Sequence, residues 1–348
     1  MERLTIKDEF PPGMLDAKAA ELVHYLQGPT LYRFSGSKSP ALFVSILLHG
    51  NEDVGWRAIQ RLFQKYHDRT LPRELLLLIG NPQAAAQGVR KLPTQEDFNR
   101  VWPGTDHSPS PIQACMEEIV EHCRHQGLFV SIDLHNNTGT NPLYGCINDL
   151  EPQTIQLASL FARTMIYFQR PLGVQSAAMS HLCPSLTCEC GKVGDPQGVD
   201  RAFEVVDACL HLSELPSHLP PETDYHLLHT TATIKVPSKT RIAWDKATDS
   251  DLWLPHDLDH RNFQPQSVGS SWGELRSGLS IHDAFLITNE EDQCVTESYF
   301  AVQDGRIQLL CNTIPAMLTQ NLQIIRDDCL GYFMEEICLA LSQRCLQC

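Results

Sequence analysis

Two residues suited to chemistry lie in the short stretch HGNE, where two positions separate His49 from Glu52. The stretch follows an apolar run, LFVSILL, which predicts a buried strand ending just before the histidine. Gly50 permits a tight turn, so the imidazole and the carboxylate could point the same way and reach one metal ion. The alternative is an ordinary surface turn in which Asn51 caps a helix and Glu52 occupies its first turn.

A second apolar strand also ends in a histidine, in the stretch VSIDLHNNTGTN. There His135 precedes a polar loop, as His49 does. Two imidazoles and the Glu52 carboxylate would form a ligand set with a fourth position open, as catalytic zinc requires, so we predict one zinc ion. Asp133 lies on the same face of this strand and could orient the ring of His135 by a hydrogen bond. Alternatively, it is a buried acid at the end of the strand.

A third stretch, SLTCECGKVGDPQGVDRA, places Glu189 inside an otherwise apolar strand. A buried glutamate is costly unless it is paired or functional. Beside a zinc-activated water, Glu189 would serve as general base and pass the proton to the leaving nitrogen. A salt-bridged glutamate at a sheet edge is the alternative.

The long polar loop NPQAAAQGVRKLPTQEDFNRVWPG supplies further polar side chains. Loops of this length inside compact domains are often functional. A guanidinium can hold a carboxylate or a polarised carbonyl with two parallel hydrogen bonds. The loop offers Arg90, Asn99 and Arg100 as candidates to hold a carboxylate or a polarised carbonyl. Solvated loop charges are the alternative for any one of these arginines.

These stretches lie in a region where strand and helix signals alternate, which predicts an α/β fold with helices on both faces of a sheet. The predicted strands cover residues 41–48, 74–79, 128–134 and 185–190, with a shorter strand signal at LYRF. The predicted helices cover residues 15–27, 53–67, 111–126, 152–168 and 197–212. Loops at strand ends are where ligands collect in such folds.

The composition changes at the proline-rich stretch SELPSHLPPETD, which predicts a linker. We predict a hydrolase α/β domain over residues 1–220 and a small β-rich domain over residues 221–348. In the second domain, Asp304 and Gly305 predict a hairpin turn, and a helix is predicted over residues 332–343.

Composition excludes several other classes of protein. The 348 residues are 42% hydrophobic, and 27 basic against 42 acidic residues give a net charge of −15, which disfavours nucleic acid as a partner. No apolar run has the length of a membrane span, and the charged start MERLTIKDEF does not resemble a signal peptide. An odd number of cysteines, 13, at irregular spacings favours reduced thiols. We expect a cytoplasmic protein without a membrane partner, and a homo-oligomer is compatible with the sequence.

Five motifs in the order HGNED, EDFNR, DLHNNT, CECG and DPQGVDRA resemble the succinylglutamate desuccinylase/aspartoacylase family, a branch of the zinc carboxypeptidase-like hydrolases. The resemblance is plain over residues 40–210. It implies a mixed, mainly parallel sheet sandwiched by helices, with a smaller carboxyl-terminal β domain. It also implies activity on small N-acylated amino acids.

The resemblance assigns roles to particular residues of this chain. The implied zinc ligands are His49, Glu52 and His135, and the implied general base is Glu189. Asn99 and Arg100 fall on the substrate-binding Asn-Arg pair of the family, and Arg90 on an arginine that precedes it. A tyrosine of the β domain closes the site in some relatives, and Tyr299 is the candidate here. Its alternative is a core aromatic residue.

The sequence departs from aspartoacylases in one respect. They carry an arginine ahead of the catalytic glutamate that grips the substrate carboxylate, but here the interval SAAMSHLCPSLTC contains none. Only His181 is a candidate there to take the place of that arginine, so the acyl group and the amino acid stay open. The rival hypotheses are a carboxypeptidase or amidase that acts on short peptides, and a noncatalytic zinc-binding protein whose β domain docks a partner.

Overall fold

The computed structural model describes residues 4–246 and 249–339, which form two compact units. The first unit comprises the residues up to Asn136, Leu143–Tyr167 and Pro171–His226. The second comprises Asn137–Pro142, Phe168–Arg170 and the residues from Leu227 on. Within the described ranges, no helix is both long and apolar enough to span a membrane.

A twisted sheet forms the centre of the first unit, with the strand order β1-β2-β4-β3-β5-β8-β6-β7. Its central strand β3 pairs in parallel with β4 and β5, whereas β2 and β4 are antiparallel, as are β6 and β8. The predicted mixed, mainly parallel sheet is therefore confirmed. The strands are β1 (Thr5–Lys7), β2 (Thr30–Phe34), β3 (Ala41–Ile46), β4 (Leu75–Ile79), β5 (Leu128–Asn137), β6 (Tyr144–Ile147), β7 (Thr164–Tyr167) and β8 (Ser185–Lys192).

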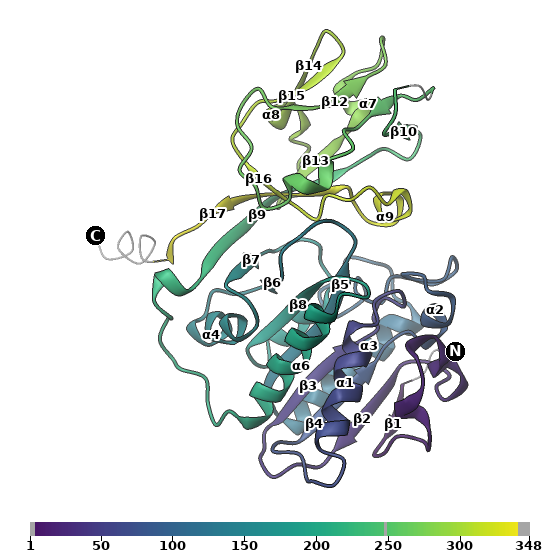
Figure 1. The fold of residues 1–348 in the computed structure, drawn as a ribbon, viewed down its shortest axis with the longest axis vertical. Helices are drawn as coiled ribbons and strands as arrows, with labels where there is room; N and C mark the ends of the chain where they lie inside the picture. The colour runs from purple at the N-terminus through teal and green to yellow at the C-terminus, as the bar shows by residue number, and fades with distance from the viewer. Residues whose placement is uncertain (1–3, 247–248, 340–348) are drawn as a thin grey trace. The chain divides into compact units, whose positions relative to one another are not determined.

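Helices cover both faces of this sheet. The helices are α1 (Val54–Lys65), α2 (Pro82–Gln87), α3 (Pro111–Gln126), α4 (Pro152–Phe161), α5 (Gln175–Ser180) and α6 (Pro196–His211), with 3-10 turns at Met14–Asp16, Ala19–His24 and Glu222–Asp224. Helices α1 and α6 pack side by side over β3, and α4 adjoins α6 (Figure 1). Helix α3 packs its apolar side against the opposite face, where Phe43 of β3 and Met116 of α3 share one core cluster.

Local sequence signals explain where these helices begin. Ser110 accepts a hydrogen bond from the backbone N–H of Gln113 at the start of α3, and Asp195 caps α6 in the same way. Each cap is followed by a proline at the first helical position, where its missing N–H costs nothing. Helix α1 differs, because its N-cap residue Asp53 makes no side-chain cap bond.

The second unit contains two groups of paired strands. In one, β9 (His226–Lys235) pairs with β13 (Leu286–Asn289) and β17 (Gly331–Glu336), and β17 pairs with β16 (Ile314–Ala316). The other has the order β10-β11-β12-β15-β14 and comprises β10 (Ile242–Ala243), β11 (Leu252–Trp253), β12 (Ser271–Leu275), β14 (Phe300–Gln303) and β15 (Arg306–Leu309). Short helices at Leu258–Arg261, Ile281–Ala284 (α7), Thr296–Tyr299 (α8) and Leu322–Asp327 (α9) connect them. The indole of Trp272 fills the core against Phe300 and Phe333, each with its ring centroid 5.2 Å away.

The structure corrects three of the predicted helices. The helix predicted over residues 332–343 is wrong as far as Glu336, because that stretch is strand β17; residues 340–343 lie outside the described residues. The helix predicted over residues 152–168 ends at Phe161, and β7 follows it. Residues 15–27 form two 3-10 turns in place of one helix. The hairpin turn predicted at Asp304 and Gly305 joins β14 to β15, and both residues have positive φ.

Candidate metal centre

The turn that follows β3 sets the positions of His49 and Glu52. Gly50 lies so close to α2 that a Cβ atom added to it would be 2.2 Å from the carbonyl carbon of Ala84. Its N–H also donates to the backbone oxygen of Arg90 at 3.1 Å. The glycine between the two candidate ligands is therefore needed for close packing, since any side chain there would push the turn away from α2.

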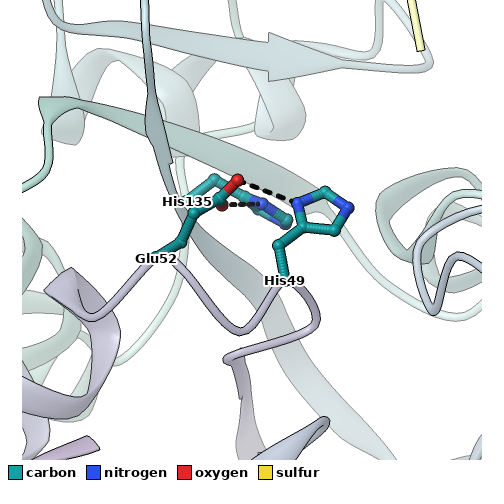
Figure 2. Close-up of side chains that lie close together, drawn as sticks. All are labelled: His49, Glu52 and His135. Carbon is teal, nitrogen blue, oxygen red and sulfur yellow. Dashed lines mark hydrogen bonds and ion pairs between the residues drawn. The ribbon is translucent and has the colours of Figure 1, made fainter. Parts of the chain in front are cut away.

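The three predicted ligands meet at one point, although His135 comes from a different strand (Figure 2). The Glu52 carboxylate bridges the two imidazoles: its Oε1 is 3.0 Å from Nδ1 of His49, and its Oε2 is 2.7 Å from Nδ1 of His135. One donor atom from each residue lies within 4.8 Å of the other two. All three residues are at most 6% exposed, so this cluster of titratable groups is shielded from bulk water.

A second carboxylate lies behind each imidazole. Nε2 of His49 is 3.0 Å from Oδ1 of Asp97, and Nε2 of His135 is 2.6 Å from Oδ2 of Asp133. Carboxylates in this position orient histidine ligands and raise their basicity, and here they leave both Nδ1 atoms directed at Glu52. The contact between Asp133 and His135 was predicted from the sequence, whereas that between Asp97 and His49 was not.

These outer carboxylates are themselves held by hydrogen bonds. Asp97 accepts from Nε of Arg90 and from the backbone N–H of Asn99, both at 2.8 Å. Asp133 accepts from Oγ of Ser45 on the neighbouring strand β3 at 2.7 Å. The imidazole planes are thus fixed before any ion binds, which lowers the entropy cost of assembling a ligand set.

Charge within the cluster favours ionised carboxylates. Burial alone would raise the pKa of Glu52, but the imidazoles of His49 and His135 outweigh it and hold that pKa well below its usual value. Burial also opposes ionisation of Asp97, but Arg90 and then His49 outweigh it and hold the pKa of Asp97 well below its ordinary range. Two buried carboxylates such as those of Glu52 and Asp97 stay ionised only beside cationic groups.

The donor set fits a zinc ion better than a magnesium or calcium ion. Two imidazole nitrogens and one carboxylate oxygen are ligands typical of zinc, whereas magnesium and calcium prefer oxygen ligands alone. Three protein ligands in place of four are also the pattern of catalytic zinc centres. The residues present therefore fit the ion that the sequence predicts.

Metal uptake should release a proton. Burial lowers the pKa of His135, but Asp133 and Glu52 outweigh it and raise that pKa well above its usual value. The metal-free ring is therefore protonated at neutral pH, while a zinc ligand must be neutral. We expect zinc binding at about pH 7 to release about one proton from His135, and affinity to rise with pH until the raised pKa is passed.

Titration calorimetry in buffers of different ionisation enthalpy measures this release directly. The variant Asp133→Asn removes one of the two carboxylates that raise the pKa of His135. Zinc binding to this variant should therefore release fewer protons per ion than zinc binding to the wild-type protein at the same pH. Equal proton release by Asp133→Asn and the wild-type protein would contradict this assignment.

Glu189, the predicted general base, lies on β8, beside the strand that carries His135. On β8, Leu186 lies against α4. Side chains alternate between the two faces along a strand, so Glu189, three positions after Leu186, projects from the other face of the sheet. On β5, Leu134 lies against α1, so His135 also projects from the face opposite α1. Since α1 and α4 both adjoin α6, Glu189 and His135 share one face on neighbouring strands. Glu189 is only 8% exposed there.

The predicted substrate-binding loop lies next to the ligand set. Arg90 contacts Asp97 as described above, and Nη1 of Arg100 donates to the backbone oxygen of Asn99 at 2.8 Å. The side chain of Asn99 is buried: its Nδ2 is 3.2 Å from Nε2 of His135 and donates to Asp133 at 3.3 Å. Its Oδ1 accepts from the first backbone N–H of α5. Asn99 thus supports the same pair that orients His135.

Tyr299 belongs to the second unit, at the end of α8. Its ring stacks on Phe333 with centroids 4.7 Å apart, and its hydroxyl forms a hydrogen bond with Thr231 at 3.1 Å. Burial raises the pKa of this phenol. A role of Tyr299 in closing the site stays a prediction.

Two further residues support the site but were not predicted to do so. Asp97 lies in the quoted motif EDFNR, two positions before Asn99, and a buried carboxylate within a candidate substrate loop is a signal that could have been read. Asn136 directly follows His135, and its backbone N–H donates to Oε2 of Glu52 at 3.2 Å. Residue spacing does not predict that contact, because it joins two segments that are far apart in the sequence.

Comparisons with known proteins agree with this geometry. The family model of the succinylglutamate desuccinylase/aspartoacylase catalytic domain matches residues 38–211, half of the chain. Among solved structures, succinylglutamate desuccinylase from Chromobacterium violaceum is similar, with 16% identity, a TM-score of 0.52 and 86% of each chain covered.

Two other solved structures give the same result. The desuccinylase from Vibrio parahaemolyticus has 12% identity and a TM-score of 0.58, with 90% of this chain and 87% of that chain covered. Murine aminoacylase 3 has 14% identity and a TM-score of 0.54, with 86% of this chain and 97% of that chain covered. A search of curated proteins returned no match. At these identities the structural likeness concerns the fold.

Proposed function

The chain belongs to the succinylglutamate desuccinylase/aspartoacylase family, and we propose that it is a zinc-dependent hydrolase that cleaves the amide bond of small N-acylated amino acids. Succinylglutamate desuccinylases and an aminoacylase are among the proteins that share its fold. Membership supports the hydrolase class, and the substrate and the metal are inferred from the side chains of this chain.

One observation carries the proposal. Two imidazole Nδ1 atoms and the Glu52 carboxylate lie within reach of one ion, and each imidazole has a carboxylate behind its other nitrogen. A chance meeting of polar side chains would not be expected to include a matched carboxylate partner for both rings. The arrangement has the features of a preorganised zinc centre.

Each residue near the centre has a proposed task. When bound, zinc would supply a Lewis acid for the scissile carbonyl and for activation of water. Glu189 takes a proton from the attacking water and returns it to the leaving nitrogen, because its carboxylate lies on the same face as His135. Arg100 stabilises the oxyanion that forms as the carbonyl is attacked. Arg90 and Asn99 hold the carboxylate end of the substrate.

Metal analysis combined with a hydrolysis screen tests the proposal. The purified protein should hold about one zinc ion per chain and should release amino acid from at least one member of a panel of N-acylated amino acids. The panel should pair acidic with apolar amino acids, and succinyl with acetyl groups. Removal of zinc by a chelator should abolish turnover, and added zinc should restore it.

The possible results separate the competing functions. Cleavage of short peptides without cleavage of N-acylated amino acids would keep the hydrolase and reject the proposed substrate class. Zinc-loaded protein that is inactive on both panels would reject the hydrolase and favour a noncatalytic zinc-binding protein.

A further inference from the structure

Asn136 forms hydrogen bonds with three residues in two separate segments of the first unit. Its backbone N–H donates to Oε2 of Glu52 at 3.2 Å. Its side-chain Oδ1 accepts from the backbone N–H of Val54 at 3.2 Å, and its Nδ2 donates to the backbone oxygen of Gly191 at 3.0 Å. The residue is only 5% exposed, so these bonds form away from bulk water.

The bond to Val54 replaces a missing helix cap. Val54 is the first residue of α1, and the N-cap residue Asp53 makes no side-chain cap bond. The amide oxygen of Asn136, on β5, satisfies one of the exposed N–H groups that begin every helix. Because Glu52 lies two residues before Val54, the bond also fixes the segment that presents the carboxylate.

The bond to Gly191 holds the end of β8 that follows the proposed base. Gly191 has a φ of +75°, a conformation that glycine adopts readily, and it lies two residues after Glu189. This end of β8 is also confined from the side of α6, since a Cβ atom added to Gly198 would be 1.9 Å from the backbone oxygen of Cys190. Asn136 supplies a side-chain contact to it from β5.

We propose that Asn136 is a positioning residue that ties the strand of Glu189 to the metal ligand Glu52. The inference rests on the proposed function, because it concerns how the base is held relative to the ligand. Glu189 lies on β8 and Glu52 lies in the turn between β3 and α1, and the separation of the two carboxylates must be kept within a fraction of an ångström for proton transfer. Asn136 forms hydrogen bonds both with the segment of Glu52 and Val54 and with Gly191 at the end of β8.

Two substitutions separate the contacts of Asn136. Asn136→Asp keeps an oxygen for the N–H of Val54, where the start of a helix also favours a negative charge, but it loses the donor to Gly191. Asn136→Ala loses both side-chain bonds. The backbone N–H that donates to Glu52 is present in both variants. Gln60→Ala serves as the control, because among the described residues Gln60 bonds the backbone oxygens of Leu15 and Ala17, away from Glu52 and Gly191.

Hydrogen exchange followed by mass spectrometry provides a readout that does not need activity. Exchange over residues 188–195 should be faster in both variants than in the wild-type protein. Exchange over residues 53–57 should be faster in Asn136→Ala alone. Gln60→Ala should change neither the exchange over residues 188–195 nor the kinetic constants.

Zinc affinity and kinetics complete the test. We expect kcat to fall roughly 10-fold to 100-fold in both variants, as is usual for residues that orient catalytic groups, with KM changed by less than about threefold. Zinc affinity should stay within about threefold of the wild-type value, because the bond to Glu52 comes from the backbone.

Three results would overturn the inference. One is an Asn136→Asp variant with wild-type kcat and wild-type exchange over residues 188–195. Another is a loss of zinc affinity as large as the loss of kcat, which would place the whole effect at Glu52. The third is unchanged exchange over residues 188–195 in both variants. If the wild-type protein hydrolyses nothing, the proposed function fails, and the exchange data alone decide whether Asn136 holds the end of β8.

Discussion

Replacing Glu189 by glutamine should leave a folded protein that binds zinc and hydrolyses almost nothing. Glutamine has the shape of glutamate but cannot accept the proton of the attacking water, so kcat should fall by a factor of about 10³, within the range attributed to a positioned general base. The zinc content should not change, because Glu189 is not one of the three proposed ligands. Single-turnover kinetics and metal analysis of the same preparation measure both quantities.

Glu290→Gln provides a control for the change from acid to amide. Glu290 belongs to the second unit, and its carboxylate pairs with His229 at 3.0 Å, so it is a partly buried glutamate beside an imidazole. This control should keep wild-type kcat. Turnover by Glu189→Gln within tenfold of the wild-type rate would reject Glu189 as the base, since a positioned base contributes more than that.

The site residues that could be predicted are those that lie at strand ends. His49 follows β3 and His135 ends the apolar part of β5, and parallel neighbouring strands bring such positions to one edge of the sheet. The spacing of Glu52 from His49 then predicted the third ligand. Glu189 was recognisable because a glutamate within an apolar strand needs a reason.

The contacts supplied by loops could not be predicted. Asp97 reaches His49 from the long segment between β4 and α3. The sequence of a loop does not indicate which part of the fold the loop will contact. The same segment contains α2, which packs against Gly50 and was not expected. The contact of the Asn99 amide with Asp133, beside His135, was likewise not predicted, and a role of Asn99 in binding substrate stays a prediction.

The error at the carboxyl end has a different origin. The stretch GYFMEE forms β17, which pairs with β9 and β16, although its residues do not exclude a helix. Phe333 and Met334 are both buried, so neither the alternation of a half-exposed strand nor helical periodicity identifies it. Pairing with a strand nearly one hundred residues earlier in the chain decides the conformation, and short-range pattern does not report such pairing.

Replacing His135 by alanine should abolish stable metal binding. Zinc in structural sites with four ligands binds with roughly 10–16 kcal/mol, so one ligand contributes about 3–4 kcal/mol and its loss weakens binding on the order of a thousandfold. Turnover should disappear at zinc concentrations that saturate the wild-type protein. Competition against a chromophoric chelator measures the affinity.

His229→Ala is the matched control for this prediction, because His229 also lies between two carboxylates, at 3.0 Å from Glu290 and 3.6 Å from Glu335. It is not part of the cluster that could hold a metal. His135→Gln adds a variant that retains an amide donor for Asp133, since alanine leaves two buried carboxylates without the imidazole between them. Both changes at His135 should lose zinc while His229→Ala keeps it. Wild-type zinc affinity in His135→Gln would show that the ion is held elsewhere, and the proposed centre would then be wrong.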